Sequence, residues 1–207
     1  MPIYAYKCES CECDFEAIVS VKAADEAECP NCGSDKVTRA YLIMITEAPS
    51  SSDQRRYAAS LLSEVLGGAD NSRLHWALIE TGIADEAQAA YDPRDATGDF
   101  LVYSSCEPDR ADEVWGIIER EISGLADSLT EDDLEKIRAK LATGVTVGGE
   151  RPGGRMQRLG RQWTYLGEYT TLEQELERIN RITVKDVKAL MKDYPFRPRT
   201  LGRMLPA

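Results

Sequence analysis

Two short stretches near the start of the chain decide how its first part folds: residues 8–11, Cys-Glu-Ser-Cys, and residues 29–32, Cys-Pro-Asn-Cys. Seventeen residues separate the two pairs, which is a spacing typical of zinc sites with four cysteine ligands. Four thiolates complete a tetrahedral shell around Zn²⁺ and leave no position for water or a substrate. We therefore predict that Cys8, Cys11, Cys29 and Cys32 bind one structural zinc ion.

The six cysteines of the chain also allow disulfide bonds as an alternative. The N-terminus lacks the basic and apolar regions of a secretion signal, and no run of about 18 apolar residues predicts a membrane span. We expect a cytoplasmic protein with no membrane contact. Thiols stay reduced in the cytoplasm, so this expectation favours zinc over disulfides.

The acidic composition disfavours nucleic acid as a partner. The 207 residues carry a net charge of −11, and residues 1–40 alone hold four basic and eight acidic side chains. A nucleic-acid reader normally presents a basic face to the phosphates. The cysteine-rich segment is therefore expected to dock on protein or to serve structure alone, and nucleic acid is an unlikely partner.

The cysteine pairs lie among strand patterns, which we predict at Pro2–Lys7 and Asp14–Val19. A unit of about 40 residues cannot bury enough apolar surface by itself, so metal binding has to supply part of its stability.

This segment resembles the FmdB-type zinc ribbons over residues 1–40. The matching residues are Met1-Pro2-Ile3-Tyr4, Tyr6, Cys8, Cys11, Phe15-Glu16 and Cys29-Pro30-Asn31-Cys32-Gly33. One departure is Cys13, where that family usually has glycine. Two cysteine pairs already fill a zinc shell, so we interpret Cys13 as a thiol outside the metal site.

The rest of the chain predicts an α+β fold with helices on one face of a mainly antiparallel sheet. Expected strands are Val37–Thr46, Ala84–Tyr91, Asp99–Ser105 and Arg199–Leu205. Expected helices begin at Ser50–Ser52, Asn71–Ser72, Pro108, Thr130, Thr171 and Thr183. Capping boxes are predicted at Ser51, Thr130, Thr171 and Thr183, where an acid or glutamine follows three residues later.

Residues 41–207 resemble the C-terminal, non-catalytic domain of insulinase/pitrilysin-type zinc peptidases. The landmarks are Leu66-Gly67-Gly68 through Ser72-Arg73-Leu74, Gly82-Ile83-Ala84, Thr97–Phe100, Thr130–Leu134, Glu150-Arg151-Pro152 and Ile182–Val187. The resemblance implies a sandwich-like domain joined to the ribbon near residue 40. The family's domain normally begins with an earlier strand and helix, which this chain replaces with the ribbon. We expect the ribbon or another chain to cover that flank of the sheet.

The resemblance does not extend to the catalytic residues of that family. Its peptidases use H-x-x-E-H for two zinc ligands and a base, whereas this chain has a single histidine, His75. The family's domain also often supplies an arginine and a tyrosine that hold substrate. Thr81 and Asp85 stand at those positions. We therefore predict no catalytic residues.

Other candidate sites are weaker. Cys106 and Ser104-Ser105 lack the partners of a nucleophile, and His75 is read as a surface or packing residue. Residues 148–155 are glycine-rich but lack the G-K-[ST] ending of a phosphate loop, so we predict a flexible break between helices. The arginines that follow are predicted to pair with acids on neighbouring helices or to line an interface: Arg151, Arg155, Arg158 and Arg161.

These observations favour a zinc-binding, non-enzymatic protein that associates with another protein. Its partner is expected to be an active insulinase-type peptidase subunit or a second copy of itself. Three alternatives stay open: the non-catalytic subunit of a two-chain metallopeptidase, a regulatory zinc-ribbon protein, and a fusion of two fragments without a joint function.

Overall fold

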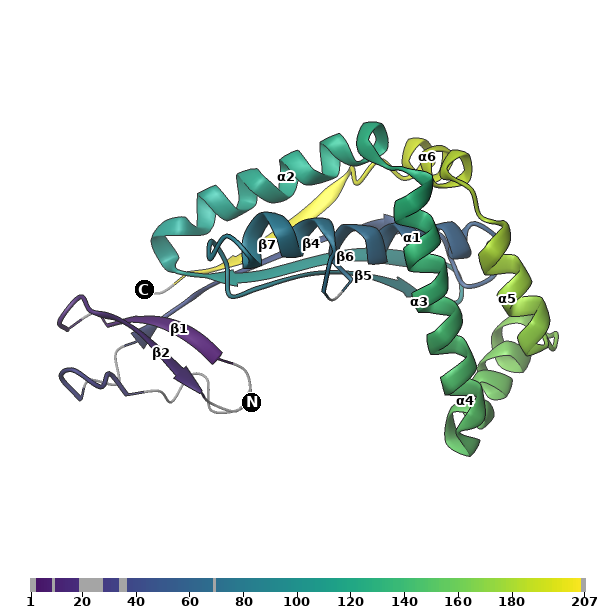
Figure 1. The fold of residues 1–207 in the computed structure, drawn as a ribbon, viewed down its shortest axis with the longest axis horizontal. Helices are drawn as coiled ribbons and strands as arrows, with labels where there is room; N and C mark the ends of the chain where they lie inside the picture. Colours follow the sequence, from purple (N-terminus) through teal and green to yellow (C-terminus); the bar gives the residue numbers. More distant parts are fainter. Residues whose placement is uncertain (1–2, 9, 19–27, 34–36, 69, 206–207) are drawn as a thin grey trace.

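Two antiparallel sheets organise the chain (Figure 1). The computed structural model describes residues 3–8, 10–18, 28–33, 37–68 and 70–205. The first sheet has the order β2-β1-β3, with β1 Ile3–Cys8, β2 Asp14–Ile18 and β3 Val37–Thr38. The second has the order β5-β6-β4-β7, with β4 Ala40–Ala48, β5 Glu86–Pro93, β6 Gly98–Cys106 and β7 Arg199–Met204. The ends of two predicted strands, Pro2 and Val19, lie outside the described residues.

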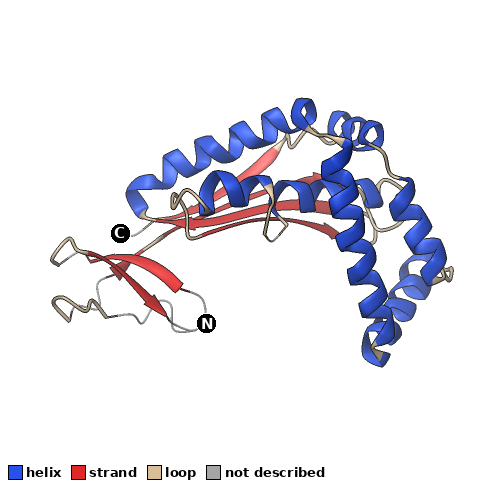
Figure 2. Cartoon of the chain, in the orientation of Figure 1, coloured by secondary structure: helices blue, strands red, loops and turns tan. Residues whose placement is uncertain are grey.

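Helices α1 and α2 lie over one face of the four-stranded sheet, while α3, α4 and α5 form an arm at its far end (Figures 1 and 2). The helices are α1 Arg56–Gly67, α2 Ala111–Ser128, α3 Glu131–Glu150, α4 Pro152–Arg161, α5 Leu172–Arg181 and α6 Val184–Asp193. Short helical turns span Pro108–Arg110, His75–Ile79 and Gln162–Leu166. The predicted α+β class, with helices on one face of an antiparallel sheet, is confirmed. None of the described helices is both long and apolar enough to cross a membrane.

The core lies between α1, α2 and the sheet. Leu61, Leu62 and Leu66 recur at helical spacing on α1 and are fully buried, as are Leu42 and Met44 of β4. The last turn of α1 lies against β5 so closely that a Cβ on Gly67 would sit 2.3 Å from the backbone nitrogen of Ala89. Only glycine fits this contact, which explains the Leu-Gly-Gly stretch in structural terms.

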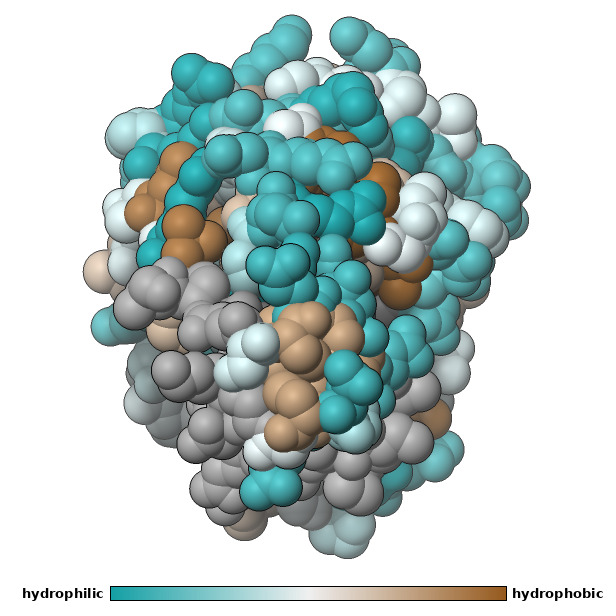
Figure 3. Space-filling view, turned by 90° about the vertical axis from the view of Figure 1, so that its left-hand side faces the viewer, coloured by the Kyte–Doolittle hydropathy of each residue, from teal (hydrophilic) through white to brown (hydrophobic). Residues whose placement is uncertain are grey.

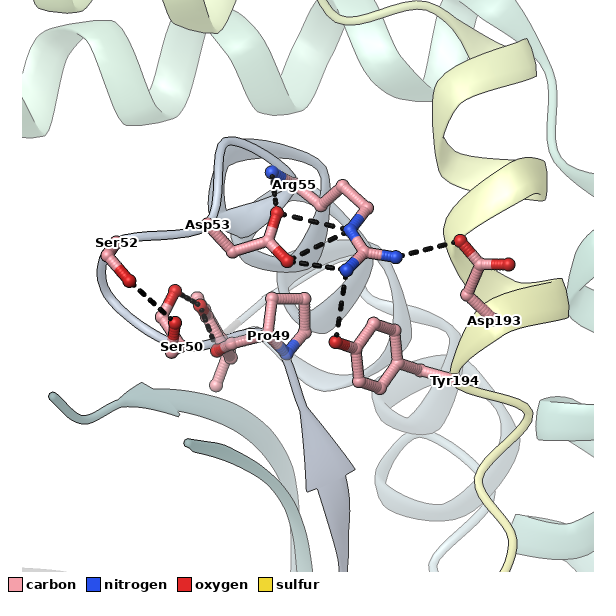
Figure 4. A network of polar contacts seen from close by, with 8 residues as sticks. Pro49, Ser50, Ser52, Asp53, Arg55, Asp193 and Tyr194 are labelled. Atoms are coloured by element: carbon pink, nitrogen blue, oxygen red, sulfur yellow. Dashed lines mark hydrogen bonds and ion pairs between the residues drawn. The ribbon is translucent and has the colours of Figure 1, made fainter. Parts of the chain in front are cut away.

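The predicted capping box at Ser51 is wrong, because α1 begins five residues later, at Arg56. The preceding segment is held by tertiary contacts instead (Figure 4). Asp53 accepts hydrogen bonds from the backbone and guanidinium of Arg55, which also bonds Asp193 at 2.8 Å and the Tyr194 hydroxyl at 3.3 Å. This guanidinium lowers the pKa of Asp53. The capping boxes at Thr130, Thr171 and Thr183 are all confirmed.

The predicted break over residues 148–155 is confined to Arg151, whose extended backbone separates α3 from α4. Residues on either side are helical, so the sequence prediction missed a helix here. The two helices approach closely at this corner, since a Cβ on Gly154 would lie 2.5 Å from the carbonyl oxygen of Gly148. The glycines therefore permit a sharp turn rather than a flexible loop.

The predicted strand Val37–Thr46 is two strands that belong to different sheets. β3 pairs with β1 in the ribbon, β4 pairs with β6 and β7, and Arg39 lies between them. Within the described residues, no ribbon strand pairs with the four-stranded sheet. The flank of β4 is covered by β7, not by the ribbon.

Candidate metal centre

Both cysteine pairs lie in tight turns. In the first, the Glu12 amide donates to the Cys8 carbonyl at 2.8 Å, and Glu12 adopts a left-handed backbone with φ 56°. In the second, the Gly33 amide donates to the Cys29 carbonyl at 2.8 Å, with φ 68° at Gly33. Such turns direct both sulfurs of a pair to the same side, as a metal knuckle requires.

The structure brings the four predicted ligands together. The Sγ atoms of Cys8, Cys11, Cys29 and Cys32 all lie within 4.8 Å of one another. Cys8 and Cys32 are separated by 3.5 Å, and Cys11 and Cys29 by 3.7 Å. A ZnS₄ tetrahedron has sulfur–sulfur edges of about 3.8 Å, given Zn–S bonds near 2.3 Å. The donor set and its spacing therefore fit a structural zinc site.

Cys13 borders this cluster but does not complete it. Its Sγ lies 3.2 Å from that of Cys11 and 3.3 Å from that of Cys29. These hydrogen bonds raise the pKa of Cys13 to about 12. The Asn31 amide, followed by the Cys13 backbone and thiol, lowers the pKa of Cys11 to about 6. The lowered pKa of Cys11 favours its thiolate, which is the form that binds a metal.

The other candidate residues have structural roles. Burial raises the pKa of the Cys106 thiol to about 11, which makes it a poor nucleophile. The Ser104 hydroxyl is buried and donates to the Glu86 carbonyl at 2.8 Å. His75 lies 3.2 Å from Glu80 and packs edge-on against Trp76. None of these side chains forms a catalytic pair within the described part of the chain.

Arg39 joins the ribbon to the larger unit, which sequence reasoning missed. Its side chain is 3% exposed and contacts Asp85 at 2.5 Å and the Ser105 hydroxyl at 3.0 Å. The same guanidinium lies 5.6 Å from the Tyr6 ring centre of the ribbon and 5.8 Å from that of Tyr41. The signal was present in the sequence, because Arg39 is the only charged residue within the run from Val37 to Thr46.

The two positions where substrate-holding residues were sought are occupied internally. Asp85 pairs with Arg39, and the Thr81 hydroxyl donates to the Ala77 carbonyl at 3.0 Å. Both side chains are therefore engaged within the chain.

The second face of the four-stranded sheet lacks a helical cover (Figures 1 and 2). Alternate strand residues point to this side, and most are partly exposed. This side is here called the open face, and its large apolar members are Tyr41, Ile43, Ile45, Leu101, Tyr103 and Met204. Ile45 is 37% exposed and Met204 is 61% exposed, so the face carries accessible apolar surface.

Comparison with known families finds a match for each of the two parts of the chain. Residues 1–41 match a zinc ribbon domain, and residues 27–141 match the Peptidase M16 inactive domain. The chain belongs to the Peptidase M16 inactive domain family. Its N-terminal part is a zinc ribbon, as predicted, and the M16 part is a non-catalytic, peptidase-like half.

Related proteins include an uncharacterized zinc protease of Mycobacterium leprae, 31% identical over 160 residues, which cover 76% of this chain and 36% of that protein. Another, from Streptomyces coelicolor, is 29% identical over 76% of this chain and 35% of its own length. The chain thus spans about a third of the length of these curated relatives.

Solved structures confirm the M16 fold. The inactive peptidase domain from Bordetella parapertussis has a TM-score of 0.71 at 19% identity, covering 81% of this chain and 91% of that one. A Helicobacter pylori protease has a TM-score of 0.75 at 18% identity, covering 84% of this chain and 43% of that one. A chain of complex III2 from Candida albicans has a TM-score of 0.72 at 16% identity, covering 80% of this chain and 42% of that one.

Proposed function

We propose that this protein is an inactive M16 half that binds a second, catalytic M16 subunit through its open face. The observation that carries the proposal is the uncovered side of the M16 sheet. The rings of Tyr41 and Tyr103 stack there at 6.4 Å, next to the exposed Ile45. Contiguous exposed apolar surface of this kind is typical of protein interfaces.

The shape of the molecule supports the same surface. The ribbon and the arm of α3, α4 and α5 both project to the side of the open face and frame it (Figure 1). In the view of the ribbon end, the coloured atoms are mostly hydrophilic, with apolar residues in small separate groups (Figure 3). The open face is therefore the surface that we propose for the partner.

A catalytic M16 subunit suits this surface because of what the chain lacks. With one histidine it cannot form H-x-x-E-H, so peptidase chemistry has to come from another M16 domain. The related zinc proteases extend well beyond the part that this chain matches. In this proposal, the chain supplies structure to a two-chain metallopeptidase and no catalytic group.

The ribbon serves this role as a stable attachment rather than as a reader of nucleic acid. We assign Cys8, Cys11, Cys29 and Cys32 as ligands of one zinc ion, and we divide the chain into a ribbon, residues 1–40, and an M16 unit, residues 41–207. The buried Arg39–Asp85 pair supports a joint function, because it connects the two units through their interiors.

Light scattering on mixtures with an M16 subunit that carries H-x-x-E-H, encoded in the same genome, tests the proposal. We expect a 1:1 complex. Ile45→Asp should weaken it at least about tenfold, because it buries an unpaired charge in the interface. The matched control is Trp76→Asp, since Trp76 is 57% exposed but lies outside the sheet. It should change the affinity less than about twofold.

Three results would overturn the proposal. The chain alone could form a dimer that excludes the peptidase subunit, which would make a second copy the partner. Ile45→Asp could leave the complex intact. The purified chain could also hydrolyse peptides by itself, which would contradict its assignment as an inactive half.

A further inference from the structure

A cavity of about 450 Å³ lies away from the open face, where the arm meets the body of the M16 unit. Its walls come from the start of α1, the end of β5 and the helices α3, α4 and α5. This volume falls within the range of about 300–1,000 Å³ that is common for small-molecule sites. Neither the zinc ribbon nor the proposed subunit interface uses this cavity.

Buried hydrogen-bonding atoms without partners are concentrated in the cavity wall. Apart from atoms of Arg39, those in the described residues are Ser51 Oγ and the Nε and Nη1 atoms of Arg158. Both residues line the cavity. A buried donor with no acceptor destabilises the fold, so such atoms are rare and call for an explanation. The described residues supply no acceptor for these two Arg158 donors, so a ligand in the cavity that Arg158 lines would have to supply it.

The cavity also has an excess of positive charge. Arg56, Arg158 and Arg161 line it, against a single acid, Glu175. Glu175 is already engaged, because it accepts a hydrogen bond at 3.0 Å from the Tyr57 hydroxyl. That hydroxyl in turn accepts from Arg56 at 2.9 Å. Two guanidinium groups therefore remain to attract an anion.

Arg151, directly before α4, and the three arginines within α4 form no direct pair with a described acid, which was one of the two roles that the sequence predicted for them. In the described part of the chain, no hydrogen bond or ion pair is formed by the side chains of Arg151, Arg155, Arg158 or Arg161. Arg158 and Arg161 line the cavity, whereas Arg155 is exposed outside it. An unpaired guanidinium at a cavity is well suited to bind a carboxylate or a phosphate.

Apolar side chains decide between these two anions. Leu141, Val145, Leu166 and Ile179 line the same cavity, and Glu175 would repel a doubly charged group. We propose that the cavity binds a small carboxylic acid with an apolar body. Its carboxylate contacts Arg158, Arg161 and the Ser51 hydroxyl, and its body packs on the aliphatic wall.

Calorimetric titration of the full, zinc-loaded chain with 3-phenylpropionate tests this proposal. We expect saturable binding of the acid, and binding at least about tenfold weaker for the neutral amide, 3-phenylpropanamide, which lacks the charge. Inorganic phosphate should bind more weakly than the acid. Stronger binding of phosphate would overturn the proposed ligand class, as would equal binding of the acid and its amide.

A matched pair of variants locates the site. Arg158→Gln should weaken the binding of 3-phenylpropionate roughly 10- to 100-fold, the usual effect of removing a charged hydrogen-bond partner. Arg155→Gln, three residues away on the same helix, should leave the affinity within about twofold. Unchanged binding in folded Arg158→Gln would refute the site. A hexapeptide that binds through its free C-terminus while 3-phenylpropionate does not would overturn the assignment to a small acid.

Discussion

The ribbon and the M16 unit bury their interiors in different ways. In the described part of the ribbon, the buried apolar side chains are Tyr6, Cys8 and Cys29, two of which belong to the proposed metal centre. The M16 unit instead has one continuous core, whose described members run from Leu42 to Phe196 and which Ala40 joins from the junction. We therefore expect the first unit to depend on a metal for its interior, whereas the second depends on apolar area.

Removing the metal should produce the largest difference in stability between the two units. The double variant Cys8→Ser, Cys11→Ser should lose zinc and unfold the ribbon, because structural zinc contributes on the order of 10 kcal/mol to such folds. Hydrogen exchange should show lost protection in β1 and β2 and retained protection in β4 and β6. Metal analysis should fall from about one zinc per chain to none.

Cys106→Ser is the matched control, since Cys106 is a buried cysteine that lies outside the metal cluster. It should keep its zinc. If the double variant retained zinc, or if the M16 core lost its protection together with the ribbon, the contrast between the units would be wrong.

Breaking the Arg39–Asp85 contact at the junction should have the next largest effect on stability. Arg39→Met leaves Asp85 without its 2.5 Å partner in a largely buried position, and loss of one member of such a pair costs about 3–5 kcal/mol. We expect the single melting transition to split into two. A calorimetric scan checks this, and a double variant with Asp85→Leu should recover part of the loss. An unchanged transition in Arg39→Met would show that the units are energetically independent.

The cap of α6 tests the M16 unit alone, with a smaller effect. Thr183→Ala should cost about 1 kcal/mol, because the Thr183 hydroxyl accepts from the Asp186 amide. The Thr183 hydroxyl and then its backbone amide lower the pKa of Asp186. A lowered folded pKa stabilises the protein above the unfolded value near 4, and this stabilisation is lost as the pH falls.

Denaturant titrations at pH 7 and pH 3 measure both the cost of Thr183→Ala and its dependence on pH. The cost of Thr183→Ala should be smaller at pH 3, because the stabilisation that comes from the lowered pKa of Asp186 is lost as the pH falls. Thr143→Ala serves as the control, since its hydroxyl bonds within α3 and caps no helix. A cost that does not depend on pH would remove Asp186 from the explanation.

The smallest expected effect lies in the first knuckle. Glu12 holds a φ of 56°, which glycine adopts without strain. Glu12→Gly should therefore stabilise the ribbon, by about 0.5–1 kcal/mol. Competition with a zinc chelator measures this as slower metal loss. Faster loss than in the parent chain would contradict the strain argument.

Much of this architecture could be predicted from local sequence. Three threonines followed by Asp or Gln at the third position gave three correct helix starts, and the spacing of the cysteine pairs predicted a cluster that the fold brings together. These features depend on residues close in sequence or on a metal motif, so local patterns suffice. The zinc ligation itself and the domain boundaries remain predictions.

Features that depend on distant residues could not be read in this way. Ser51 and Gln54 have the spacing of a cap, yet Arg55 contacts Asp193 and Tyr194, almost 140 residues away, and the helix begins later. The helix α4 was missed because its glycines suggested a loop, whereas Gly154 serves the close approach of two helices. The cavity beside it follows from that approach and has no local signature.

The buried position of Arg39 has a practical consequence for dividing the protein. A fragment that begins at Ala40 would remove the Arg39 guanidinium that pairs with Asp85, and a fragment that ends at Thr38 would remove the same guanidinium from the Tyr6 ring. Truncation here would expose one acid and one aromatic ring to solvent. Expression of either half therefore calls for a compensating substitution, such as Asp85→Asn in the larger fragment.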